Sequence, residues 1–192
     1  MKLILNKKYN PLFSSDARYF IITGGRGSGK SFAVTVFLTL LTMTKGIRIL
    51  FTRYTMTSAH LSIIPEFLEK IGLLGFDEVF SINKAEVVNT SNQSDILFRG
   101  IRTSAGNQTA SLKSLQGIST WVLDEAEELV DENIFDTIDL SIREKNIHNR
   151  VVLILNPVTK EHWIYKRFFE DKGVEGGFNG FKDNVCYIHT SY

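Results

Sequence analysis

The sequence predicts an α/β fold with a mostly parallel central sheet, helices on both faces and a short antiparallel extension. Two observations predict it. Short apolar segments alternate with longer segments of helical character, a pattern typical of parallel strands joined by helices. The first apolar segment continues directly into a glycine-rich segment and then a helical one, as in a βαβ unit. The 192 residues suffice for one core, so we expect a single domain over 1–192.

The first three elements form the predicted βαβ unit. Residues 19–22 are an apolar strand, and residues 31–44 contain neither proline nor glycine and favour a buried helix. Lys45 and Gly46 supply a basic last turn and a terminating glycine for this helix. The continuously apolar segment 47–53 is typical of a strand that is covered on both faces.

The middle of the chain departs from this alternation. Residues 58–71 favour a helix that is interrupted at Pro65 and closed by Gly72. Three short strand candidates follow at 78–82, 86–89 and 95–100. Asn, Ser and Lys residues separate them, which predicts an antiparallel insertion or edge. We expect the polar segment 102–113 to be a loop.

The alternation then resumes. The remaining elements are expected in the order strand 120–124, helix 132–145, strand 151–156, helix 160–170 and strand 185–192. Asp131 and Thr159 are the expected N-caps of the two helices. The glycine-rich segment 173–180 is expected to be a flexible connector before the last strand.

The composition is that of a globular protein and excludes several other classes. Hydrophobic residues make up 43% and charged residues 22%, unlike disordered or fibrous chains. A net charge of +1 leaves any nucleic-acid contact to a local basic patch. The single cysteine, Cys186, excludes an intrachain disulfide, and no apolar segment is long enough to span a bilayer. We therefore expect a cytoplasmic protein without a membrane partner.

The glycine-rich segment has the full G-x-x-x-x-G-K-[ST] spacing of a phosphate-binding loop, here called the P-loop. It consists of Gly24, Gly25, Arg26, Gly27, Ser28, Gly29, Lys30 and Ser31, and Phe32 continues the nucleotide-binding segment into the helix. Its glycines let successive N–H groups point into one concavity at a helix N-terminus, where a polyphosphate fits. Lys30 is expected to reach the β and γ phosphates and Ser31 to hold Mg²⁺. The predicted cofactors are ATP and Mg²⁺.

An acid pair supplies the second part of the predicted site. Asp124 and Glu125 follow the apolar strand 120–124, and ligands of open α/β sheets bind at this end of the strands. Asp124 is expected to hold Mg²⁺ together with Ser31, and Glu125 to act as general base on the attacking water. These residues predict a Mg²⁺-dependent NTPase. Glu127 and Glu128 are expected to form the acidic first turn of a solvated helix.

Asn156 ends the next apolar strand and is followed by Pro157. Its side-chain amide projects toward the place where a γ phosphate or the attacking water would lie, so Asn156 could sense that phosphate. A turn-forming asparagine before proline is the alternative. The spacing leaves both open.

These motifs together resemble the ATPase domain of phage terminase large subunits. The likeness rests on the P-loop with its internal Arg26, on 121–126, on the strand that ends in Asn156 and Pro157, and on 113–118. It implies a P-loop fold of the ASCE type and ATP hydrolysis that drives double-stranded viral DNA into a capsid. It also implies a homo-oligomeric ring when assembled, with the isolated domain expected to be a monomer, and a portal protein and a small terminase subunit as partners. The host cell cytoplasm is the implied location, and the family has a C-terminal nuclease domain that this chain lacks.

The resemblance also implies roles for cationic residues. Arg26 is similar to the family's loop arginine that contacts the nucleotide phosphates, and its N–H donors suit that role. Lys113 stands where several relatives have an arginine that acts in the neighbouring subunit's site, and this departure leaves the trans-acting residue open. Arg99, Arg102 and Arg143 are the alternatives.

The base pocket and the second strand end are less specific. Tyr9, Asn10 and Phe13 lie upstream of the P-loop, where the family packs adenine, and an aromatic ring could stack on the base. The alternative is that Tyr9 and Phe13 are core residues. Arg53 resembles a family arginine that could support the P-loop or face DNA, or it could cap the strand end.

Other functions remain open alongside the packaging motor. A helicase-like or recombinase-like DNA-dependent ATPase has the same fold but is expected to carry further basic motifs, which the sequence does not show. A nucleotide-gated assembly scaffold would bind ATP without depending on hydrolysis. A small-molecule kinase is disfavoured because Glu125 directly after Asp124 suits activation of water.

Overall fold

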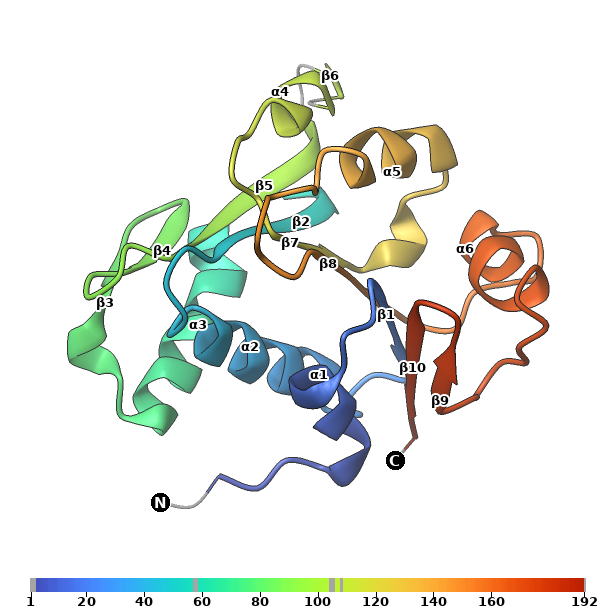
Figure 1. The fold of residues 1–192 in the computed structure, drawn as a ribbon, viewed down its shortest axis with the longest axis horizontal. Coiled ribbons are helices and arrows are strands. Elements are labelled where there is room, and N and C mark those ends of the chain that lie inside the picture. The colour runs from blue at the N-terminus through green and yellow to red at the C-terminus, as the bar shows by residue number, and fades with distance from the viewer. Residues whose placement is uncertain (1–2, 57–58, 104–105, 108, 192) are drawn as a thin grey trace.

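A computed structural model describes residues 3–56, 59–103, 106–107 and 109–191. Its centre is a sheet of six parallel strands with helices on both faces (Figure 1). The parallel strands lie in the order β5 (Asp95–Thr103), β2 (Arg48–Thr55), β7 (Thr120–Asp124), β8 (Arg150–Leu155), β1 (Tyr19–Gly24) and β10 (Val185–Thr190). The predicted α/β class with a mostly parallel sheet is confirmed.

Antiparallel strands extend the sheet at both sides. On one side, β4 (Glu86–Asn89) pairs with β5, and β3 (Phe80–Ile82) pairs with β4. Strand β6 (Gly106–Asn107) also pairs with β5. On the other side, β9 (Gly180–Lys182) pairs with β10. The extension beside β5 was predicted, although β5 itself belongs to the parallel sheet. Strand β9 begins at Gly180, the last residue of the expected connector 173–180. A tight turn at Asp183, whose φ is 52°, folds β9 back onto β10.

Two helical layers enclose the sheet, as Figure 1 shows. The short turn η1 (Lys7–Tyr9) and helices α1 (Asn10–Ser14), α2 (Lys30–Leu41) and α3 (Ala59–Leu74) pack on one face. Helices α4 (Thr109–Lys113), α5 (Glu132–Asp139), α6 (Trp163–Tyr165) and the π-helical η4 (Lys166–Glu170) pack on the other. Two turns, η2 (Asp77–Val79) and η3 (Ala126–Glu128), complete the elements.

Side chains along the strands alternate between the two layers. In β1, Phe20 and Ile22 belong to the core under α2 and α3, whereas Ile21 belongs to the core under α5 and α6. This alternation follows from the two-residue period of a strand. Within the described part of the chain, no helix has the length and apolar character needed to cross a membrane.

The expected interruption of the 58–71 helix at Pro65 is wrong. Helix α3 continues through Pro65 and Gly72 to Leu74, while the expected first residue, Ser58, lies outside the described residues. Ile63, Ile64 and Phe67 are each no more than 3% exposed. Burying this apolar face against the sheet outweighs the lost backbone hydrogen bond, because tertiary packing overrides local propensity.

Helix α5 is shorter than the expected 132–145, although Asp131 caps it as predicted, accepting a hydrogen bond from the Asn133 N–H at 3.0 Å. Arg18 explains the early end. Its guanidinium donates to the backbone carbonyls of Asp139 and Ile142 at 3.1 and 2.9 Å. The chain turns there instead of continuing the helix.

The expected helix 160–170 with a Thr159 cap is replaced by α6 and η4. Helix α6 starts at Trp163, and its cap is His162, whose Nδ1 accepts from the Ile164 N–H at 3.2 Å. The expected loop 102–113 also contains β6 and α4, in its described part.

Arg18 provides a test of the fold. Its ion pair with Asp139, at 2.5 Å, has side chains only 24% and 9% exposed, and Tyr19 shares the same carboxylate at 2.7 Å. Replacing Arg18 with Ala should lower the free energy of unfolding by about 2 kcal/mol, below the full cost of breaking a buried pair because Arg18 is partly solvated. Chemical denaturation measures this loss.

The exposed pair Lys172 and Asp183, at 3.0 Å, serves as the control. Lys172→Ala should cost less than about 1 kcal/mol. Equal losses in the two variants would contradict the structural role of Arg18.

Candidate nucleotide-binding site

One cavity of about 450 Å³ lies where the parallel strands end. The carboxyl ends of β1, β2, β7 and β8 deliver its polar groups: the P-loop follows β1, Arg53 lies in β2, Asp124 ends β7 and Asn156 follows β8. Residues 25–32 form one wall and residues 154–156 part of another. The acidic side chains at 124, 125, 127 and 128 also line the cavity. The predicted P-loop, acid pair and Asn156 therefore share one site.

Two glycines of the P-loop are required by its shape. A Cβ at Gly24 would lie 2.3 Å from the Thr190 carbonyl oxygen, so only glycine allows this close approach to β10. Gly29 caps α2 with φ 83° and ψ 11°, a left-handed conformation that side chains disfavour. Helix α2 thus begins at the cavity, with its N-terminal N–H groups available to an anion.

Tyr9 supports the P-loop from the core side. Its hydroxyl lies 3.1 Å from the Ser28 carbonyl, to which it donates, and 3.2 Å from Thr190 Oγ1. The residue is 2% exposed and belongs to the hydrophobic core under α2, and burial raises the pKa of its hydroxyl. The Tyr9 ring packs in the core, and Tyr9 is not among the residues that line the cavity. This position agrees with the alternative that Tyr9 is a core residue.

Lys30 lies along the P-loop. Its ammonium donates to the carbonyls of Gly24 and Gly25 at 2.5 and 2.9 Å. Burial lowers the pKa of Lys30, while the carboxylates of Glu127 and then Asp124 oppose that shift. The P-loop carbonyls are thus the acceptors for the ammonium of Lys30, which lines the cavity.

Arg53 holds both acids that follow β7. Its Nε and Nη2 donate to Oδ2 of Asp124 at 2.8 and 2.7 Å, and Nε lies 3.7 Å from Oε2 of Glu125. The Asp124 side chain is 7% exposed, and a carboxylate that is buried needs such a partner. The sequence analysis did not predict this contact. It expected Arg53 to support the P-loop, to face DNA or to cap the strand end.

Glu125 combines an unusual backbone with a shifted pKa. Its φ and ψ are 54° and 46°, a left-handed conformation that is uncommon for residues other than glycine. Burial raises the pKa of its carboxyl, Arg53 lowers it, and Asp124 raises it again. A raised pKa makes a carboxylate a better general base.

Glu127 is a site residue that the sequence analysis missed. It lies in the turn η3 and lines the cavity, and its Oε1 accepts a hydrogen bond from Asn156 Nδ2 at 2.6 Å. The expectation of a solvated helical turn is therefore wrong for Glu127, while Glu128 is exposed. The acidic sequence 124–128 did not distinguish the two, because their difference comes from the contact with the residue that follows β8.

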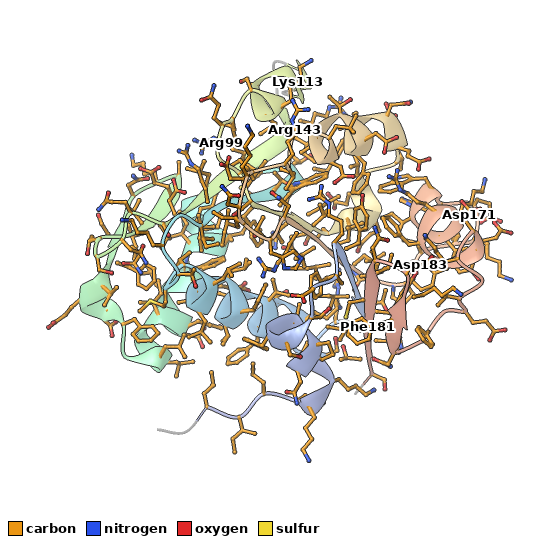
Figure 2. All side chains as sticks on the ribbon, viewed as in Figure 1. Arg99, Lys113, Arg143, Asp171, Phe181 and Asp183 are labelled. Carbon is orange, nitrogen blue, oxygen red and sulfur yellow. The ribbon has the colours of Figure 1, made fainter. Side chains whose placement is uncertain are left out.

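The remaining predicted residues lie outside the cavity wall, with the exception of Arg26. Asn10 is exposed, and the ring of Phe13 packs edge-on against Phe37 at 5.4 Å. Figure 2 shows Lys113, Arg99 and Arg143 at the end of the molecule that carries α4. Lys113, Arg102 and Arg143 are exposed, whereas Arg99 donates to the carbonyls of Ala85 and Phe98. Arg26 is exposed within the cavity wall.

The donors present suit a magnesium ion. The Ser31 hydroxyl and the Asp124 carboxylate line the same cavity, and Mg²⁺ binds through one or two protein oxygens, phosphate oxygens and water. Arg53 uses a single oxygen of Asp124 for both of its hydrogen bonds. In the described residues, no cluster of three or more His, Cys, Asp or Glu side chains forms a self-contained metal site.

Solved structures with the same fold come from phage proteins. The large terminase of a thermophilic bacteriophage superposes with a TM-score of 0.73 at 13% identity, over 98% of this chain and 46% of that chain. The N-terminal domain of the DNA packaging ATPase from bacteriophage phi29 gives 0.69 at 15%, over 98% and 96%. The large terminase ATPase domain of Thermus phage P74-26 gives 0.65 at 18%, over 98% and 81%.

The chain thus spans less than half of the first of these large terminases. That protein has also been solved in complex with ADP and with ATP-γ-S. A comparison with curated protein sequences gave no match. The model of the family described as phage terminase large subunit matches residues 16–192. This chain therefore belongs to the phage terminase large subunit family.

Proposed function

We propose that this chain is a Mg²⁺-dependent ATPase domain that powers the packaging of double-stranded DNA. One observation carries the proposal: the P-loop, Asp124 and Glu125 line a single cavity. A polyphosphate cradle alone binds nucleotide, whereas a carboxylate that faces the same cavity can activate water for attack on the γ phosphate. Family membership supports the same activity.

Each residue has a role that its position supports. The N–H groups of the P-loop and the start of α2 bind the phosphates, and Lys30 exchanges the carbonyls of Gly24 and Gly25 for phosphate oxygens. Ser31 and Asp124 hold Mg²⁺, which neutralises charge on the phosphates. Arg26, exposed in the cavity wall, has guanidinium donors suited to phosphate oxygens.

Glu125 is the proposed general base. Its raised pKa and its place beside the cavity suit the removal of a proton from water. The neighbouring Arg53 aligns Glu125 with Asp124, so the metal ligand and the base are fixed to each other.

The DNA and partner assignments rest on the family. Relatives of this fold include a DNA packaging ATPase and a protein described as a DNA packaging motor. We infer that this chain acts on double-stranded DNA as part of a homo-oligomeric ring, with a portal protein and a small terminase subunit, in the host cytoplasm. Lys113, Arg102 and Arg143 are exposed and remain the candidates, with Arg99, for a cation that completes a neighbour's site.

Glu125→Gln tests the proposed activity. The variant keeps the side-chain size and loses the base, so ATP hydrolysis in the presence of double-stranded DNA should fall about 10²- to 10⁴-fold. Nucleotide binding, measured by calorimetry with Mg²⁺, should stay within about twofold because the P-loop is unchanged.

Glu170→Gln is the matched control, because Glu170 is exposed at the end of η4, and it should change neither quantity. Hydrolysis that survives in Glu125→Gln would exclude Glu125 as the base. A wild-type chain that binds ATP but does not hydrolyse it with DNA would favour the scaffold alternative.

The backbone of Glu125 provides a separate test. Glu125→Ala and Glu125→Gly both remove the carboxylate, but only glycine relieves the strain of a φ of 54°. Glu125→Gly should therefore be more stable than Glu125→Ala by about 1 kcal/mol in denaturant unfolding, and both should be inactive. Equal stabilities, or a more stable alanine variant, would show that the left-handed conformation is not retained.

A further inference from the structure

We propose that Glu127 is a positioning residue that orients the side-chain amide of Asn156 and thereby sets the preference of the cavity for a nucleotide with a γ phosphate. The inference rests on the proposed function, because it concerns how the same cavity distinguishes ATP from ADP. Its basis is the contact between η3 and the residue that follows β8.

The contact determines which atoms Asn156 presents to the cavity. Asn156 Nδ2 donates one hydrogen to Glu127 Oε1 at 2.6 Å. An asparagine amide has a second N–H and an acceptor oxygen, and both remain for the cavity that Asn156 lines. With the first N–H engaged, the amide cannot rotate without breaking a charge-assisted hydrogen bond, which is roughly twice as strong as a neutral one.

The second carboxylate oxygen of Glu127 is not used by Asn156. Its Oε2 is buried, and no donor in the described part of the chain forms a hydrogen bond with it. A buried carboxylate oxygen without a donor is costly and is therefore rarely kept for packing alone. Glu127 lines the same cavity as Lys30 and Asn156, so the contact between Glu127 and Asn156 lies at the site proposed for the phosphates.

The main chain of Glu127 is held from the other side. His162 Nδ1 accepts from the Ile164 N–H at 3.2 Å, so its Nε2 carries the hydrogen that is donated to the Glu127 carbonyl at 3.1 Å. Trp163 Nε1 donates to the Leu129 carbonyl at 2.5 Å. The turn η3 is thereby fixed to α6, which anchors the backbone from which the Glu127 side chain reaches Asn156.

The experiment compares the affinities for ATP-γ-S and ADP, each with Mg²⁺, in the wild-type chain and in variants. We expect the ratio of the two affinities to fall about tenfold in Asn156→Ala, the effect of losing one hydrogen bond to a charged group. Glu127→Ala should give the same loss with ADP affinity unchanged within about twofold. The double variant should lose no more than the worse single variant, because both residues act through one amide.

Two further variants separate positioning from general destabilisation. Glu127→Gln keeps an acceptor for Asn156 Nδ2 and should retain most of the preference, while Glu170→Ala, at an exposed position, should retain all of it. Thermal unfolding of each variant identifies any loss of fold, and Glu127→Gln keeps the test valid where Glu127→Ala does not fold.

The outcomes that contradict the inference are distinct. The inference would be wrong, with the proposed function unaffected, if Glu127→Ala kept the wild-type ratio of affinities. It would also be wrong if the losses in this ratio from the two single variants added in the double variant. A wild-type chain that binds ADP and ATP-γ-S equally would also contradict the inference, because the cavity would then have no preference for Glu127 to set. A wild-type chain that binds neither nucleotide would overturn the proposed function and this inference with it.

Discussion

The register of the parallel strands is the constraint on which the site depends. Thr52 pairs with Leu123, Asp124 with Ile154, and Thr23 with Leu155. The next residue along each strand therefore brings Arg53 level with Asp124, and Asn156 level with the start of the P-loop. Because these strands are buried on both faces, a slip by one residue would exchange their two core faces. Packing of the two apolar cores thus fixes the relative positions of Arg53, Asp124 and Asn156, which line the cavity.

Several sequence predictions succeeded because the signal was local. The P-loop and β7 are each specified by contiguous residues, and Asp124 ends its strand at the predicted position. The failures share a different cause. Helix α5 ends early because Arg18, 121 residues away, binds the Asp139 carbonyl. The side chain of Glu127 is set apart from the exposed Glu128 by its hydrogen bond with Asn156, 29 residues away. Such contacts between distant segments leave no periodic pattern in the sequence.

Several polar and charged side chains of the cavity already have partners within the protein. Arg53 binds Asp124, Lys30 binds P-loop carbonyls, and Asn156 binds Glu127. A nucleotide that binds in this cavity would therefore exchange these partners for its own contacts. Such exchange reduces the net gain from each new contact, because the desolvated groups were already stabilised. It also ties nucleotide binding to movements of the side chains that line the cavity.

These pairings explain how the strained backbone at Glu125 is maintained. A left-handed residue other than glycine costs of the order of 1–3 kcal/mol and persists only where its surroundings determine it. The segment after Asp124 is held by Arg53 from β2, by Asn156 after β8, and by His162 and Trp163 at the start of α6. Three separate parts of the fold thus fix one short turn. Because Arg53 and Asn156 themselves line the cavity, the conformation of Glu125 depends on the same side chains that a nucleotide would contact.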